Sequence, residues 1–239
     1  MKKNINLYLS KIYRSPKKNR CQVFLEIPSK KRIAVFLRLS KHLRYQILNG
    51  LEEEQIIILL TALEPDDATD VLRLFDKKNQ EKLLNEMSQD IQDQINLLLK
   101  FDRETAGGLM TLDYIQVDVE DTIAEIADKF RVHEKRTGKP PEIIALNQSK
   151  VVGYVPGYEL GFAKTDEKIK KYVRTIKTVH YGASNKKVIE KFRNHPHKKL
   201  VVFDDNNNVI GIIYADDVLR VLKEQESASL YGFAGVKKE

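Results

Sequence analysis

The sequence predicts an all-α superhelical N-terminal domain followed by a tandem pair of α+β units. Two internal repeats carry this prediction, because apolar pairs recur at short intervals in the first half and a strand–helix–strand–strand pattern occurs twice in the second. A content of 42% apolar and 31% charged residues over 239 positions is that of ordinary globular domains. We therefore expect a folded chain with at least two domains.

The first repeat consists of adjacent apolar residues spaced 11 or 12 positions apart. The pairs are Phe24-Leu25, Phe36-Leu37, Ile47-Leu48, Leu59-Leu60, Val71-Leu72 and Leu83-Leu84. A polar residue suited to starting a helix follows most pairs, namely Ser40, Glu52, Glu64, Asp76 and Ser88. Helices this short are unstable alone and must bury their apolar edges on one another. The repeat predicts a helical superhelix over residues 24–104, preceded by a basic segment at residues 1–23.

The second repeat begins after residue 104. Residues 117–130 (the end of a strand, a polar turn and a helix) match residues 179–192. Two further strands follow each copy, at 143–146 and 151–155 and again at 200–203 and 209–214, and a helix closes each unit, clearly so at 216–226. We predict units at 105–165 and 166–225, with a further helix starting in 226–239.

Charge is concentrated at the N-terminal end. The first 50 residues hold thirteen Lys and Arg against one acid, Glu26, so they carry +12, and the remaining residues carry −5 of the total of +7. Such a block can bind an anionic membrane surface, nucleic acid or an acidic partner, or it can be a solvated helix face. No aromatic stacking cluster or nucleic-acid reading helix accompanies it, which disfavours nucleic acid.

The sequence favours a cytoplasmic location. The longest apolar run, at residues 56–63, is much shorter than the roughly 20 residues of a membrane-spanning helix. We identify no signal peptide, and the single cysteine, Cys21, cannot form an intrachain disulfide. No nucleophile constellation or glycine-rich phosphate loop is present, so we expect a protein that is not an enzyme. His195 and His197 lack the spacing of a transition-metal site.

Three features together resemble a known family: residues 63–70 (LEPDDATD), residues 104–111 (ETAGGLMT) and the tandem units that follow. They are similar to the cytosolic region of MgtE-type magnesium transporters, where a helical superhelix precedes a pair of CBS domains. The resemblance covers residues 24 to the C-terminus. It implies a magnesium-sensing regulatory module, a homodimer formed through the CBS pair, and a connecting helix leading to a membrane domain. The chain would be part of such a transporter or a relative without a pore.

The resemblance also implies how sensing works. In the family, Mg²⁺ lies between acidic faces of the superhelix, the CBS pair and the connecting helix, and it closes the cytosolic assembly. The matching acids here are Asp66, Asp70, Asp216 and Asp217. Asp66 and Asp70 are four residues apart and share a helical face, so they can share a cation. As an alternative, Pro65, Asp66 and Asp67 are simply a favourable helix start.

Several family acids are replaced near the C-terminus. Asp216 and Asp217 remain, whereas the later matching positions are Arg220, Lys223, Gln225 and Ala228, and residues 30–38 are basic. One hypothesis is that fixed cations such as Arg220 take the place of Mg²⁺ and hold the domains together by ion pairs. The alternative is that these are ordinary surface charges.

CBS pairs often bind adenine nucleotides, which gives a second candidate ligand. The usual pattern is a strand glycine, then Ser or Thr three residues on, then Asp three further. The second unit holds Gly211, Tyr214 and Asp217 at these positions, and the first holds Gly153, Pro156 and Glu159. Gly211 and Asp217 are therefore candidate nucleotide contacts, although Asp217 can equally cap its own helix. The alternative function is a stand-alone CBS protein that binds a nucleotide or a protein without sensing magnesium.

Overall fold

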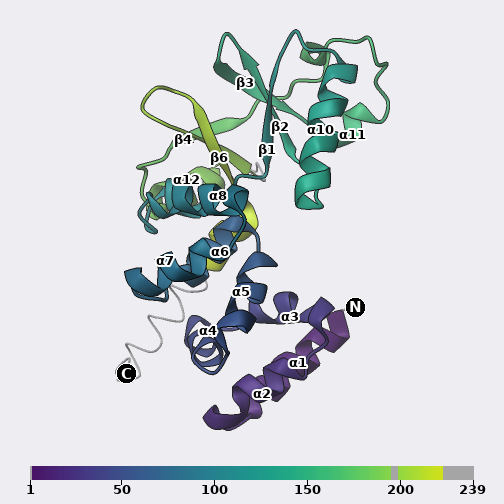
Figure 1. The fold of residues 1–239 in the computed structure, drawn as a ribbon. Coiled ribbons are helices and arrows are strands. Elements are labelled where there is room, and N and C mark those ends of the chain that lie inside the picture. Colours follow the sequence, from purple (N-terminus) through teal and green to yellow (C-terminus); the bar gives the residue numbers. More distant parts are fainter. Residues whose placement is uncertain (1, 195–198, 223–239) are drawn as a thin grey trace. The chain divides into compact units, whose positions relative to one another are not determined.

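The computed structural model describes residues 2–194 and 199–222, and side chains from residue 5 onward (Figure 1). The chain divides into two compact units, Met1–Leu98 and Leu99–Glu239. The first is helical and the second holds all of the strands in the described ranges. This division follows the change of repeat in the sequence. The predicted fold class is confirmed.

The helical unit is a succession of short helices, as the apolar pairs predict. They are α1 Lys2–Arg14, η1 Lys17–Asn19, α2 Arg20–Leu25, α3 Ser29–Phe36, α4 Lys41–Leu48, α5 Glu53–Thr61, α6 Pro65–Leu72, α7 Lys77–Asn85 and α8 Gln89–Leu99. Ser40 and Asp76 cap α4 and α7 through their side chains, and Glu52 forms a capping box with Gln55 at α5. Glu64 is the N-cap of α6 without a side-chain hydrogen bond.

The predicted apolar pairs form the core of this unit. Phe24, Phe36, Ile47, Leu60 and Leu72 are at most 1% exposed. Each helix contributes one edge to the core, which no helix of two or three turns could bury alone.

Residues 1–23, predicted as a separate basic segment, lie within the helical unit. They form α1, η1 and the start of α2, and α1 packs on α2 and α3. Ile5 and Ile12 are 7% and 0% exposed, because they are seven residues apart on the buried face of α1. The many basic residues of this segment conceal its apolar stripe, so the sequence pattern does not join it to the superhelix.

A second periodic feature ties the helices to one another. Long polar side chains reach back five residues to the backbone carbonyl in the turn that follows a helix. They are Arg20 to Ser15, Arg32 to Ile27, Arg44 to Leu39, Gln80 to Phe75 and Gln92 to Met87, at 2.8–3.2 Å. Their positions are separated by 12 residues or a multiple of 12. The repeat therefore satisfies carbonyls that a helix end leaves without partners.

The second unit contains two three-stranded sheets of the same topology (Figure 1). Its elements are α9 Ala106–Leu109, β1 Tyr114–Asp118, α10 Ile123–Thr137, β2 Glu142–Asn147, β3 Lys150–Val155, α11 Gly157–Leu160, η2 Ile169–Lys171, β4 Lys177–His180, α12 Asn185–Asn194, β5 Lys199–Phe203 and β6 Val209–Tyr214. A helix follows at 215–222. In each sheet the first two strands are parallel and the last two antiparallel. The predicted twofold repeat of strand, helix, strand, strand and helix is confirmed.

The two sheets exchange their preceding segments. The segment before the first sheet pairs with the second sheet, and the segment before the second sheet pairs with the first. Thr111 bridges Ile212 of β6, and Arg174 bridges Tyr154 of β3. Ile169 is fully buried in the core of the first sheet, together with residues of β1, α10 and β2. The predicted boundary between 165 and 166 therefore differs from the packing, because residues 165–174 lie against the first sheet. Sequence periodicity carries no signal for such an exchange.

Candidate functional site

The predicted acidic pair of the helical unit lies on α6. Asp66 and Asp70 are one helical turn apart, and both are half-buried. Asp70 forms an ion pair with Arg73, whose Nη1 lies 3.8 Å from its Oδ1. Pro65 is the first residue of α6, and Asp66 and Asp67 lie in its first turn. The favourable helix start is therefore present, and the shared cation of Asp66 and Asp70 stays a prediction.

The predicted acids of the second unit lie at the start of the helix after β6. Asp216 is exposed, whereas Asp217 is half-buried. The Tyr214 backbone N–H donates to Asp217 Oδ2 at 3.4 Å, and Arg220 Nη2 donates to Oδ1 at 3.1 Å. Asp217 therefore caps its own helix, and its pair with Arg220 lies within that helix. Interdomain pairing by Arg220 stays a prediction, and Lys223, Gln225, Ala228, His195, His197 and residues 226–239 lie outside the described residues.

Four carboxylates act on the side chain of Tyr214, which lies three residues before Asp217. Burial raises the pKa of Tyr214, and the carboxylates of Glu142, Asp113, Asp217 and Asp216 raise it further. Asp113 precedes β1 and Glu142 begins β2, so acids from both sheets act electrostatically on one phenol. No motif singles out Asp113 or Glu142, which is why the sequence did not yield them as candidates.

Lys199 provides positive charge in this acidic region. Its Nζ lies 2.5 Å from Glu142 Oε2 and 4.5 Å from the centre of the Tyr154 ring. The lysine begins β5 and Glu142 begins β2, so this ion pair joins the two sheets. At 16% and 22% exposed, both side chains are largely sheltered, so the pair is less screened by salt than a surface pair.

Gly211 has a packing role in this structure. A Cβ at Gly211 would lie 2.5 Å from Met110 Sδ, which is closer than a side chain tolerates. Met110 is 1% exposed and belongs to the segment that joins the second sheet. The glycine of the predicted nucleotide pattern is thus explained by close packing, and its nucleotide contact stays a proposal.

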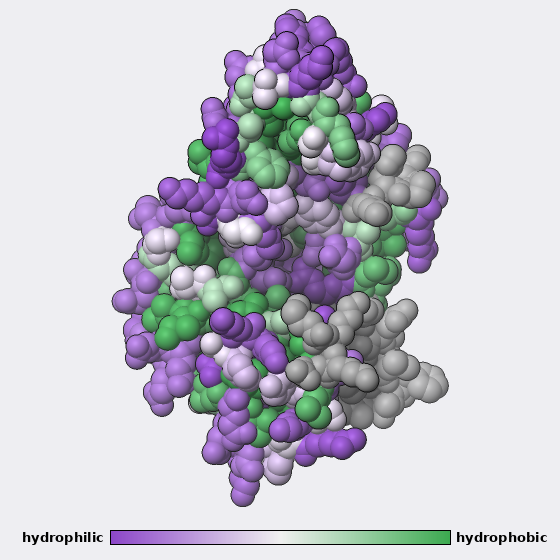
Figure 2. Space-filling view, turned by 90° about the vertical axis from the view of Figure 1, so that its right-hand side faces the viewer, coloured by the Kyte–Doolittle hydropathy of each residue, from purple (hydrophilic) through white to green (hydrophobic). Residues whose placement is uncertain are grey.

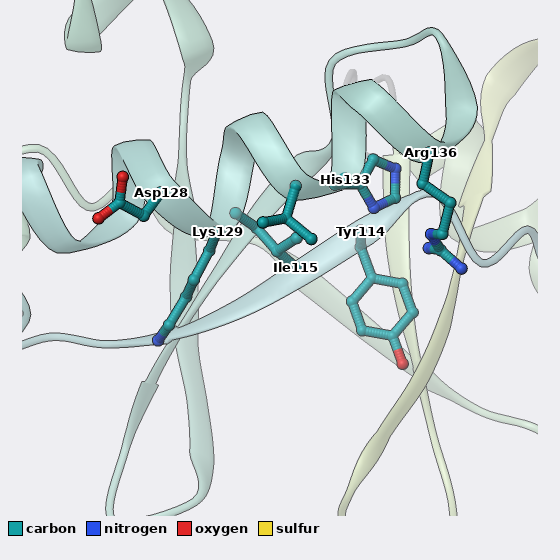
Figure 3. Close-up of a pocket in the computed structure, with 7 residues that line it drawn as sticks. Tyr114, Ile115, Asp128, Lys129, His133 and Arg136 are labelled. Carbon is teal, nitrogen blue, oxygen red and sulfur yellow. The ribbon is translucent and has the colours of Figure 1, made fainter.

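A pocket of about 520 Å³ lies between β1 and α10 (Figure 3). It is lined by Tyr114, Ile115, Asp128, Lys129, Val132, His133 and Arg136. His133 is 4% exposed, and its Nε2 has no hydrogen-bond partner among the described atoms and lies 3.9 Å from Asp113 Oδ1. Burial and the nearby Arg136 lower the pKa of His133, and Asp113 opposes them. None of the predicted site residues lines this pocket.

The available donor atoms determine whether a magnesium ion fits this chain. Within the described ranges, no group of three or more His, Cys, Asp or Glu side chains converges to hold a metal. Mg²⁺ usually keeps several waters and takes one or two carboxylates from a protein. Asp66 and Asp70 offer oxygen donors of this kind on one helical face. The donor chemistry therefore fits a hydrated Mg²⁺, without a complete protein cage.

These features define a class of protein in which a superhelix of short helices precedes a pair of α+β units. Residues 8–104 match the family model of the MgtE intracellular N domain, and residues 169–224 match that of the CBS domain. The predicted resemblance to the cytosolic region of MgtE-type magnesium transporters is confirmed.

Similar proteins agree with both matches. The magnesium transporter MgtE of Bacillus subtilis (strain 168) is 20% identical over 81% of this chain and 43% of its own length. The crystal structure of the cytosolic domain of the Mg²⁺ channel MgtE in complex with ATP has a TM-score of 0.78 and 21% identity, and the match covers 89% of this chain and 88% of that one. The soluble part of a magnesium transporter has a TM-score of 0.63 at 18% identity, covering 94% and 98%.

The chain spans less than half the length of the curated relatives that it matches. The solved structures are less than 25% identical to it, so they establish the fold. The predicted cytoplasmic location agrees with the description of one of them as a cytosolic domain. Within residues 2–194 and 199–222, no helix has the length and apolar character needed to cross a bilayer.

Proposed function

We propose that this chain is a non-catalytic, magnesium-sensing regulatory module of an MgtE-type magnesium transport system, acting at the cytosolic face of the membrane. The observation that carries the proposal is the shared architecture, since one fold match with a TM-score of 0.78 covers 89% of the chain. The membrane domain of such a transporter is the proposed partner. The acids of α6 and of the helix after β6 are the proposed ion-responsive groups.

The physical basis of sensing is charge neutralisation. Carboxylates held near one another repel, and a hard divalent cation between them turns repulsion into attraction. We assign Asp66 and Asp70, together with Asp216 and Asp217, as the carboxylates that respond to Mg²⁺. Association of the two units on neutralisation would then report the ion concentration.

The test is a thermal-unfolding titration with MgCl₂ against NaCl at matched ionic strength, which separates binding from screening. A ligand at a hundred times its dissociation constant stabilises the native state by about 2.7 kcal/mol. For a chain of this size we expect a magnesium-specific rise in melting temperature of roughly 5–10 °C.

A charge-matched pair of variants locates the response. Asp66→Asn/Asp70→Asn should remove most of the magnesium-specific rise. Asp90→Asn/Asp93→Asn removes the same charge from exposed positions on α8 of the same unit and should retain it. An identical melting temperature in the two salts for the parent chain would refute magnesium sensing.

Adenine nucleotide is a second candidate ligand, because the similar cytosolic domain is described in complex with ATP. Asp217 is the carboxylate assigned to the ribose hydroxyls, and Gly211 lies on the strand before it. Isothermal titration with ATP and AMP should detect binding, and Asp217→Asn should weaken it at least tenfold. Because Asp217 also caps its helix, the circular dichroism of the variant must match the parent. Absence of heat with both nucleotides would leave a protein-interaction role for the CBS pair.

A further inference from the structure

The N-terminal end of the helical unit carries cations that the fold does not use internally. Three arginines of this region are engaged inside the unit: Arg20, Arg32 and Arg44 donate to backbone carbonyls at helix ends. Lys11, Arg14, Lys17 and Lys18 differ, because all four are exposed and none forms an ion pair with a described carboxylate. The first acid in the sequence is Glu26, so no negative charge offsets them locally.

The outward surface of α1 and η1 has a defined composition. Leu7, Lys11 and Arg14 follow one another at helical spacing, so they share a face of α1, and η1 continues the chain with Lys17 and Lys18. Leu7 is 55% exposed on this face, and Tyr13, which is 52% exposed, lies about 120° around the helix from Leu7. We call the exposed residues Leu7, Lys11, Tyr13, Arg14, Lys17 and Lys18 the basic face.

The opposite face of α1 is occupied. Ile5 and Ile12 are buried where α1 packs on α2 and α3. The helix cannot turn its apolar stripe outward without exposing both isoleucines to water and losing this packing. A partner must therefore be bound by the cations and by the two exposed side chains, while α1 stays folded on the unit.

From this arrangement we propose that the basic face docks on an anionic lipid surface. A bilayer presents negatively charged headgroups above an apolar layer, and cations interleaved with an exposed leucine and tyrosine are complementary to both. Lysine, the main cation here, binds as a point charge and suits diffuse headgroup charge. Figure 2 shows hydrophobic groups interrupted by hydrophilic side chains on the face it presents, rather than one broad apolar surface. This proposal goes beyond magnesium sensing and does not depend on it.

The experiment is vesicle co-sedimentation of the whole chain with phosphatidylcholine alone and with 30% phosphatidylserine. We expect binding to the anionic vesicles only, weakening as NaCl rises from 50 to 300 mM. Each cation near an anionic surface contributes about fivefold in affinity, and screening reduces this. Lys11→Gln/Arg14→Gln/Lys17→Gln/Lys18→Gln should therefore lower binding at least tenfold.

A matched variant separates the basic face from total charge. Lys150→Gln/Lys177→Gln/Lys186→Gln/Lys187→Gln removes the same charge from exposed positions of the second unit and should change binding less than threefold. Leu7→Ser/Tyr13→Ser, which keeps every charge, should lower binding two- to tenfold. Because all of these positions are exposed, the melting temperatures should stay within a few degrees of the parent.

Three results would overturn the proposal. The first is equal sedimentation with neutral and anionic vesicles, and the second is equal loss in the two charge variants. The third is binding of a labelled 20-nucleotide DNA through the basic face without vesicle binding, which would assign the surface to nucleic acid. The magnesium titration gives an independent result, since the basic-face variant keeps Asp66 and Asp70. Failure of lipid docking and failure of magnesium sensing are thus distinguishable.

Discussion

At the scale of single residues, two glycines make the exchange of segments between the sheets possible. A Cβ at Gly153 would lie 2.2 Å from the Arg174 carbonyl oxygen, and Gly211 has the corresponding approach to Met110. The Arg174 oxygen accepts a hydrogen bond from the Tyr154 N–H. The backbone at Arg174 therefore cannot move away from an added Cβ without losing this hydrogen bond.

Gly153→Ala should therefore destabilise the second unit by more than about 2 kcal/mol, seen as a lower urea midpoint. Gly157→Ala is the control, because no atom lies within 4 Å of a Cβ built there, and it should change stability by less than about 1 kcal/mol. Equal midpoints for the two variants would contradict this explanation of Gly153.

His133 predicts a pH dependence of stability. Its pKa in the folded state is lowered by burial and by Arg136, so the unfolded chain binds this proton more readily. Stability from this group is present above the unfolded pKa of about 6.5 and is lost as pH falls through the folded pKa. The second unit should thus be less stable at pH 5.0 than at pH 7.5.

His133→Gln should reduce the difference between the urea midpoints measured at pH 7.5 and at pH 5.0. His42→Gln, at an exposed histidine of the helical unit, should leave it unchanged. A parent-like pH difference in His133→Gln would exclude His133 as its source.

At the scale of elements, the 12-residue repeat joins helix ends by side chains as well as by apolar packing. Arg44 illustrates this, since it donates to the carbonyls of Phe36 and Leu39, each at 3.1 Å, and to that of Leu37. At the equivalent positions 56 and 68 the residues are Ile56 and Ala68, which are buried. The same position of the 12-residue repeat is thus occupied either by a polar side chain that caps a helix end or by a buried core residue.

Arg44→Met keeps most of the apolar stem and removes the charged donors. We expect it to lower the stability of the helical unit by about 1.5–3 kcal/mol, the range for hydrogen bonds to charged groups. Arg38→Met changes an exposed arginine in the turn after α3 and should cost less than about 0.5 kcal/mol. If thermal unfolding shows equal losses, the carbonyl contacts are not what stabilises this turn.

At the scale of the whole molecule, the second unit exposes large apolar side chains on two helices that share a core. Val132 on α10 is 70% exposed, and Tyr158 on α11 and the nearby Phe162 are 68% and 88% exposed. Phe130 and Leu160 of the same helices pack on the core of the first sheet. Exposed groups of this kind commonly mark an interface.

We predict a homodimer formed through these residues, measured as the mass from light scattering coupled to size exclusion. Val132→Asp/Phe162→Asp should shift the chain to monomer by placing charge in the interface. Ile58→Asp, at a 62% exposed position on α5, should remain dimeric. A parent chain that is monomeric at 100 µM would contradict the prediction.

Local sequence patterns predicted most of the helices and strands of the fold. The apolar pairs and helix caps located the short helices, since helix ends and buried edges are set by neighbours three or four residues away. The same local character explains the error at residues 1–23, where charge density concealed the buried stripe of Ile5 and Ile12.

The candidate site was less accessible from sequence. Asp66, Asp70, Asp216 and Asp217 came from a resemblance, and their roles stay proposals. Asp113 and Glu142 had no signal of their own, because only the packing of two sheets brings them to Tyr214.

The sequence by itself determined the two repeats, the helices and strands they produce, the charge of the N-terminal end and the family that the chain resembles. The tertiary structure alone decided which segment joins which sheet, which arginines serve as caps and which acids surround Tyr214. The physical reason is range: helix caps and strand alternation depend on neighbours along the chain. Burial, ion pairing and close backbone approach depend on residues such as Gly211 and Met110, which are 101 positions apart and meet only when the chain is folded.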